Sequence, residues 1–195
     1  DIPMTDLPAG AMTGLVPAIL FAIISFMPAV TSTSSVAISL EGQKLWILRA
    51  HPVRTEDIFT AKAMVNMTVM APAFVLSLIL VGIRLSLSPI LVLGMCFSGV
   101  LQCALLSSLG LVINLFYPKF DWENETQVVK QSMSVIVNMV AGLFVSAIPF
   151  VIFFAAFSEQ STEVLVLLCA FVYAILIAGT SIFLKTVGKR MFLRL

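Results

Sequence analysis

Few residues in this chain have types suited to acid, base or metal chemistry, and none stands in the pattern that such chemistry needs. The single histidine, His51, precedes Pro52 in a charged segment, and the chain contains neither GxSxG nor HExxH. We expect a loop residue there. Three carboxylates in FYPKFDWENE suggest a cation site, but their spacing matches no calcium loop, so a solvated face is favoured. They are Asp121, Glu123 and Glu125.

The sequence also lacks the patterns that are typical of nucleotide binding and redox chemistry. Gly188-Lys189-Arg190 has neither the upstream glycine nor the hydroxyl of a phosphate-binding loop. The three cysteines, Cys96, Cys103 and Cys169, lie in apolar runs without CxxC or Cys/His spacing, which indicates buried thiols rather than a disulfide framework or a zinc site. We therefore expect no catalytic residue, cofactor site or metal site.

The composition indicates an integral membrane protein. Of 195 residues, 60% are hydrophobic and only 11% charged, and the mean hydropathy is +1.10. The net charge of +1 gives no reason to expect nucleic acid as a partner. Because the sequence begins at Asp1 and lacks the features of a signal peptide, we expect an excerpt from a longer protein.

Five apolar runs are long enough to cross about 30 Å of hydrocarbon as helices, which predicts an all-α, polytopic bundle forming one transmembrane domain. The predicted spans are 13–40, 63–83, 87–115, 132–157 and 164–184. The polar segments between them are 41–62, 84–88, 116–131 and 158–163.

The distribution of lysine and arginine predicts the orientation, because these residues are retained on the cytoplasmic side. With segment 41–62 inside, ten of the eleven basic residues lie inside and only Arg84 lies outside. The ten are Lys44, Arg49, Arg54, Lys62, Lys119, Lys130, Lys185, Lys189, Arg190 and Arg194. We expect a multi-pass protein of the cytoplasmic (plasma) membrane with its N-terminus outside and its C-terminus inside.

Hydroxyl and amide side chains interrupt the apolar runs, and they allow two interpretations. The first run contains Pro28, which should kink it, followed by a serine- and threonine-rich stretch. Such side chains join helices in membranes or line a wet path. The candidates for a substrate path are Thr31, Ser34, Ser35, Gln102, Asn114 and Asn138.

The segment 41–62 carries seven charged residues among 22 and cannot lie in hydrocarbon. If its first part is helical, the apolar residues 45–48 surround the helix axis, which favours burial between the bundle and another protein. Pro52 should end that helix, and Thr55 could cap a second one with Glu56 and Asp57 in its first turn. The pattern predicts a rigid cytoplasmic corner able to transmit force from a soluble partner.

A resemblance to a known family rests on these residues. The run SSVAISLEGQKLWILRAHPVRTEDIFTAK, followed by LGLVINLFYPKFDWENETQVVKQS, resembles permease subunits of bacterial type-2 ATP-binding-cassette exporters. The similarity covers roughly residues 31–134. It is carried by the serine-rich helix end, Glu41-Gly42, Leu45-Trp46, Pro52, Lys62, Pro118, Trp122 and Asn124-Glu125.

The resemblance implies a permease whose cytoplasmic segment docks on a separate ATP-binding-cassette ATPase subunit. The docking residues it implies are Glu41, Lys44, Trp46, Arg49, Pro52, Arg54, Glu56 and Lys62. Permeases of this family commonly have six helices in each half, so five helices suggest the C-terminal half of a permease, working with a second half or as a homodimer in the lipid bilayer.

Three functions remain open from the sequence, with the permease favoured. An ion-coupled secondary transporter is disfavoured because no charged residue lies at the middle of a predicted span. A membrane-embedded enzyme would need histidine or paired carboxylates at the bilayer surface, and only the group at 121–125 offers any. We therefore expect ATP hydrolysis on a partner rather than on this chain.

Overall fold

Helices make up nearly all of the chain that the computed structural model describes, namely residues 9–30, 33–44, 47, 50, 52–156 and 161–194. The longer helices are α1 (Ala9–Ile24), α4 (Thr55–Arg84), α5 (Pro89–Phe116), α7 (Met133–Ala156) and α8 (Thr162–Phe183). The shorter elements are α2 (Met27–Val30), the 3-10 segments η2 (Thr33–Val36) and η3 (Ser39–Lys44), α6 (Glu125–Gln131), the π-helical turn η4 (Leu184–Gly188) and α9 (Lys189–Arg194).

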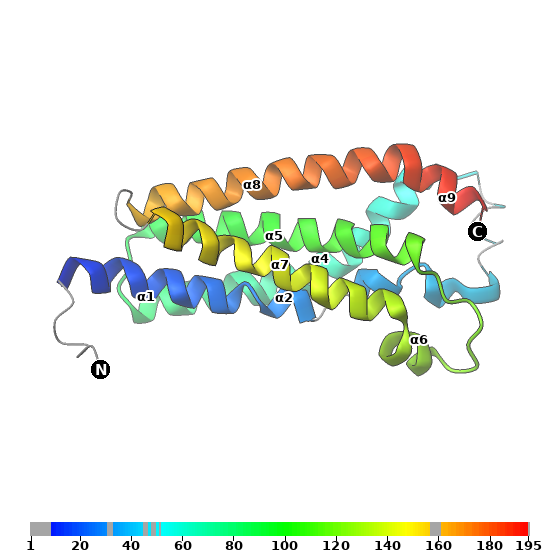
Figure 1. Ribbon diagram of the computed structural model, residues 1–195, viewed down its shortest axis with the longest axis horizontal. Coiled ribbons are helices and arrows are strands. Elements are labelled where there is room, and N and C mark those ends of the chain that lie inside the picture. The colour runs from blue at the N-terminus through cyan, green and yellow to red at the C-terminus, as the bar shows by residue number, and fades with distance from the viewer. Residues whose placement is uncertain are drawn as a thin grey trace.

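Within the described residues, five stretches are long and apolar enough to cross a membrane, which confirms the predicted all-α bundle. They are Val16–Gly42, Thr55–Arg84, Pro89–Phe116, Met133–Ala155 and Thr162–Arg194. The spans run alternately up and down, so that α1 begins at the end of the bundle opposite to α9 (Figure 1). An odd number of alternating spans in the described part of the chain accounts for this separation of α1 and α9.

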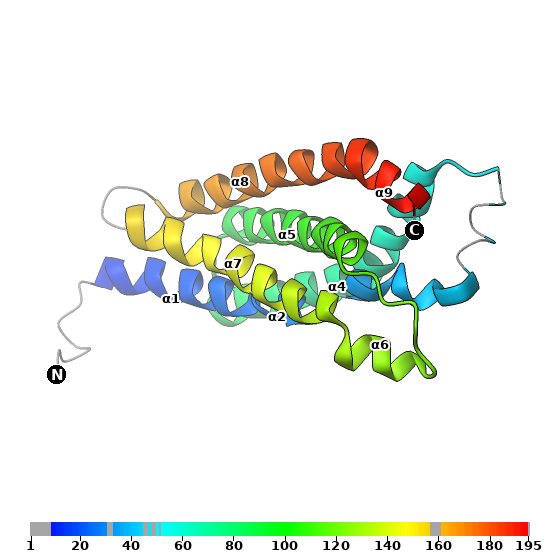
Figure 2. The same ribbon diagram turned by 45° about the vertical axis from the view of Figure 1, so that its right-hand side comes forward.

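The central helix of the bundle is α5, which contacts α4, α7, α8 and η2. Its burial explains why so many small and amide residues lie along it, since close helix contacts need small side chains and buried amides need partners. Gly99 of α5 illustrates the first need, because a Cβ there would lie 2.0 Å from the ring of Phe74 on α4. The helices α4 and α8 lie on different sides of α5 (Figures 1 and 2).

The first span is not one kinked helix over 13–40, as the sequence suggested. The helix α1 ends at Ile24, a turn follows at Ser25 and Phe26, and the chain continues as α2, η2 and η3. Pro28 lies inside α2, four residues after the end of α1. Because proline cannot donate to the carbonyl four residues earlier and its ring clashes with that carbonyl, the break after Ile24 lies where Pro28 is expected to interrupt the helix.

The second span begins at Thr55, eight residues before the expected start at 63, so residues 55–62 are helix and not loop. The prediction that Thr55 caps this helix is wrong, since the cap position is taken by Arg54 without a side-chain cap bond. Glu56 and Asp57 do lie in the first turn, as predicted. The charged corner is thereby continuous with a helix of 30 residues, which is about 45 Å long.

Candidate functional site: the broken end of the first span

The most distinctive feature of the bundle is the irregular backbone between Ser25 and Lys44. Backbone groups at membrane depth that lack helical partners are costly unless protein supplies their hydrogen bonds. Here side chains from α4, α5 and α7 supply them at three positions along the chain. We call these positions the Ser25, Thr33 and Ser39 junctions.

At the Ser25 junction, the carbonyl of Ser25 accepts two side-chain hydrogen bonds. Gln102 Nε2 on α5 and Ser146 Oγ on α7 each donate to it at 2.8 Å. Ser25 and Gln102 are fully buried. Gln102 Oε1 and Ser25 Oγ have no hydrogen-bond partner within the described residues. Some of the buried polar atoms at this junction therefore lack a hydrogen bond.

The Thr33 junction connects the first span to α4. The backbone nitrogen and the hydroxyl of Thr33 both donate to Asn66 Oδ1, at 3.0 and 2.9 Å. Asn66 Nδ2 in turn donates to Ser107 Oγ of α5 at 2.7 Å. Because Asn66 is buried and its oxygen and nitrogen are both engaged, one amide links three transmembrane segments.

The Ser39 junction is the most completely bonded of the three. Asn114 Oδ1 on α5 accepts from the backbone nitrogens of Ile38 (2.8 Å) and Ser39 (3.1 Å). Asn114 Nδ2 donates to Ser39 Oγ at 2.7 Å and to Ser134 Oγ of α7 at 3.4 Å. The amide therefore replaces the helical partners that the backbone lacks where η2 gives way to η3.

The loop after α5 packs on the Ser39 junction. Trp122 Nε1 donates to the carbonyl of Ser39, and the backbone nitrogen of Lys119 donates to Ser39 Oγ, both at 3.0 Å. Gly42 has a φ of +52°, a conformation that disfavours side chains, and a Cβ there would lie 3.0 Å from the indole of Trp122. Trp122 thus packs on the broken segment.

Lys62 joins the end of the broken segment to α4. Its Nζ donates to the carbonyl of Ala37 at 2.7 Å and to Glu41 Oε1 at 2.5 Å. The lysine side chain is only 15% exposed and that of Glu41 33%. The two charges assigned by resemblance to partner docking therefore pair with each other.

The other implied docking residues lie toward solvent or outside the described residues. Arg54 forms an exposed ion pair with Asp57 at 3.0 Å, and this hydrogen bond, together with the aspartate charge, raises the pKa of Arg54. Lys44 and Pro52 are exposed and Glu56 is half-buried. Trp46, Arg49 and His51 lie outside the described residues, so their docking or loop roles stay predictions.

The candidate path residues are all buried, apart from Thr31, which lies outside the described residues. Those described are Ser34, Ser35, Gln102, Asn114 and Asn138. Four cavities in the described part of the bundle are lined by other residues. The bonds of Gln102 and Asn114 favour the helix-joining interpretation for those two side chains, and a substrate path through the set stays a prediction.

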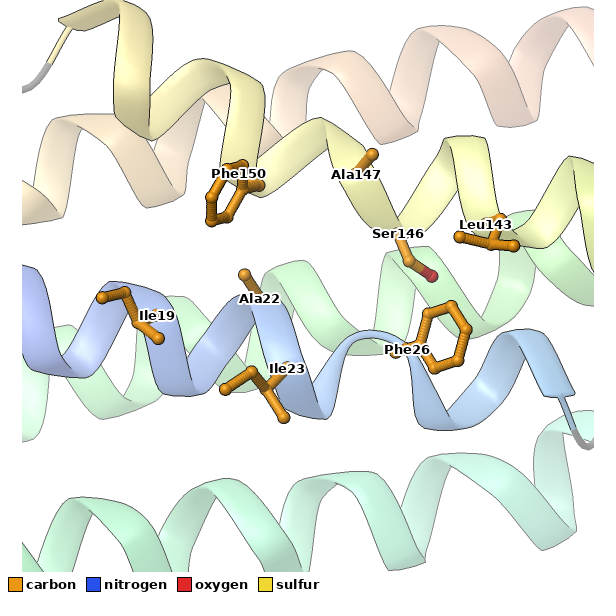
Figure 3. A pocket seen from close by; sticks show the side chains of 8 residues that line it. All are labelled: Ile19, Ala22, Ile23, Phe26, Leu143, Ser146, Ala147 and Phe150. Atoms are coloured by element: carbon orange, nitrogen blue, oxygen red, sulfur yellow. The ribbon is translucent and has the colours of Figure 1, made fainter.

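Two apolar cavities flank the Ser25 junction. One, of about 370 Å³, lies between α1 and α7, where Ile19, Ile23 and Phe26 face Leu143 and Phe150 (Figure 3). The other, of about 260 Å³, lies on the α4 side and includes Pro28 and Phe74 in its lining. Open apolar hollows in the surface therefore border the incompletely bonded break on two sides.

Sequence reasoning missed several residues at these junctions, among them Ser25, Ser39, Asn66, Ser134 and Ser146. Asn66 sits alone in the apolar run 63–83, and this was the same signal that singled out Gln102 and Asn114. Ser39 carries no comparable signal, because serine is common in membrane helices.

The described residues include no group of three or more His, Cys, Asp or Glu side chains able to hold a metal ion. The carboxylates Asp121, Glu123 and Glu125 are exposed. A comparison of the chain with protein-family models, with curated proteins and with solved structures found no match. Its function must therefore be inferred from the sequence pattern and the geometry.

Proposed function

We propose that the chain is the transmembrane permease component of an ATP-driven exporter, powered by a separate ATP-binding-cassette ATPase subunit. The observation that supports this proposal most strongly is the connection around Lys62. Residues 41–54, the segment expected to meet the ATPase, are bounded by Glu41, which pairs with Lys62, and by the start of α4. A displacement of this segment is therefore passed to both the first span and α4.

Two further observations support it. Residues that carry the family resemblance but lie far apart in sequence meet at the Ser39 junction, where Glu41-Gly42, Lys62 and Trp122 adjoin the serine-rich helix end. The elements that carry most of the basic residues, η3, the start of α4, α6 and α9, lie at one end of the bundle (Figure 1). By the positive-inside rule, we expect that end in the cytosol and the start of α1 outside.

The proposed mechanism uses the difference between the continuous helix α4 and the broken first span. ATP hydrolysis on the partner would bias the bundle between two states, provided that the contacts differ between them. The continuous helix α4 acts as a lever, and the first span can change shape at the incompletely bonded Ser25 junction. The substrate path would open within this chain or against a second permease half or copy. Catalytic side chains are not required here.

The test is reconstitution of the full chain with candidate ATPase subunits in plasma-membrane lipids. The expected result is co-purification and a raised ATPase rate. The variant Trp46→Ala with Arg49→Glu should lose the stimulation, whereas Arg84→Glu, at the other end of α4, should keep it. Failure of every ATPase subunit to bind, with transport driven by an ion gradient instead, would contradict the proposal in favour of a secondary transporter.

A further inference from the structure

A groove of about 420 Å³ lies between α4 and α8. Both helices pack on α5, but they diverge from each other, so that Ala104 and Ser108 of α5 form the floor. Met64 and Met67 line one wall and Ile177 the other. Phe59, one turn into α4, also lines the groove and packs edge-on against Phe192 of α9, with their ring centres 5.5 Å apart.

The groove changes from charged to apolar along its length. Glu56, in the first turn of α4, and Lys185, in the π-helical turn η4, line the end near the predicted cytoplasmic surface. Because α4 is about 45 Å long and the hydrocarbon is about 30 Å thick, the first turn of α4 reaches the headgroup region. The methionines lie two to three turns deeper, at hydrocarbon depth.

Neither charge at the mouth is in an ion pair within the described residues. The ion pairs in that part of the chain are Arg54 with Asp57 and Glu41 with Lys62. The mouth therefore offers one carboxylate, which accepts hydrogen bonds from a primary ammonium group, and one ammonium group, which attracts phosphate. π-Helical turns such as η4 are frequent at functional sites.

We propose that this groove binds one phospholipid of the cytoplasmic leaflet whose headgroup carries both a phosphate and a primary amine, as in phosphatidylethanolamine. Lys185 contacts the phosphate, Glu56 accepts from the amine, and an acyl chain lies along Met64 and Met67, whose flexible side chains adapt to it. The proposal goes beyond the transport function and requires only that the chain spans a bilayer.

The experiment is native mass spectrometry of the full chain, exchanged separately into phosphatidylethanolamine, phosphatidylcholine and phosphatidylglycerol. We expect the first lipid to be retained about tenfold better than the others, which corresponds to one charge-assisted hydrogen bond. Phosphatidylcholine has no N–H to donate to Glu56, and phosphatidylglycerol has no amine at all. Equal retention of the three lipids by the unmodified chain would overturn the proposal.

Two variants locate the site. Glu56→Gln with Lys185→Gln should abolish the preference, whereas Glu163→Gln with Arg84→Gln, at the opposite end of the bundle, should preserve it. Ala104→Leu should fill the floor and lower retention of every lipid, and its folding is checked by circular dichroism. If that variant does not fold, the paired glutamine variant decides alone. An unchanged lipid preference in the Glu56→Gln, Lys185→Gln variant would overturn the assignment. So would a mass spectrum in which this variant loses a second bound copy of the chain and not a bound lipid.

Discussion

The first span and α4 cross the same bundle in opposite ways. The helix α4 runs unbroken for 30 residues, although Pro72 lies inside it, and its backbone is satisfied largely by its own carbonyls. The first span is broken at Ser25 and again between η2 and η3, and it depends on Gln102, Asn66 and Asn114 from other helices. The first span therefore keeps its shape only while the neighbouring helices keep theirs. That dependence makes it the part of the bundle that a partner can reshape.

The largest effect is expected from Asn114→Leu, which leaves the buried nitrogens of Ile38 and Ser39 without their acceptor. Since each unpaired buried group costs about 1–3 kcal/mol, the free energy of unfolding should fall by about 3 kcal/mol. The measurement is unfolding of the detergent-solubilised chain. The control is Thr68→Val on α4, whose hydroxyl donates only to Met64 O of its own helix. Equal losses in the two variants would remove the contrast between the spans.

A smaller loss is expected from Gln102→Leu at the Ser25 junction. Ser146 still donates to the Ser25 carbonyl in this variant, so the free energy of unfolding should fall by only about 1–2 kcal/mol. When Ser146→Ala is added to Gln102→Leu, the further fall in the free energy of unfolding should exceed the fall that Ser146→Ala causes in the otherwise unmodified chain. Strictly additive losses, measured in the same unfolding assay, would show that the two donors do not share this acceptor.

The connection between Glu41 and Lys62 should show a coupling of about 1 kcal/mol. Lys62→Met removes the donor to both Ala37 O and Glu41, while Glu41→Gln removes only the charge. A double-mutant cycle on the free energy of unfolding isolates the pair. Full additivity would contradict the proposed link between segment 41–54 and the two spans.

The smallest effect is expected from Arg54→Ala or Asp57→Ala. This ion pair is exposed, with 83% of the arginine side chain accessible, so water and salt screen it. Neither variant should change the unfolding transition measurably. A clear loss of stability would mean that the start of α4 is buried by contacts outside the described residues.

The spans were predictable from the sequence to within a few residues at most ends, because about 20 apolar residues are needed to cross hydrocarbon. The interior of the first span was predictable only in part. Pro28 marks the break after Ile24, four residues earlier. The side chains that bond the Ser25 carbonyl there, Gln102 and Ser146, lie 77 and 121 residues away and could not be inferred. The pairing of Glu41 with Lys62 depends likewise on tertiary contact, so the sequence showed two charges without showing that they meet.

Hydrogen exchange at the amides of Ile38 and Ser39, measured in lipid nanodiscs, tests most directly whether side chains of other helices hold the broken span. The account predicts slow exchange in the unmodified chain and exchange at least about tenfold faster in Asn114→Leu, with the amides in the middle of α4 unchanged. Equal exchange at Ile38 and Ser39 in the two proteins would contradict it.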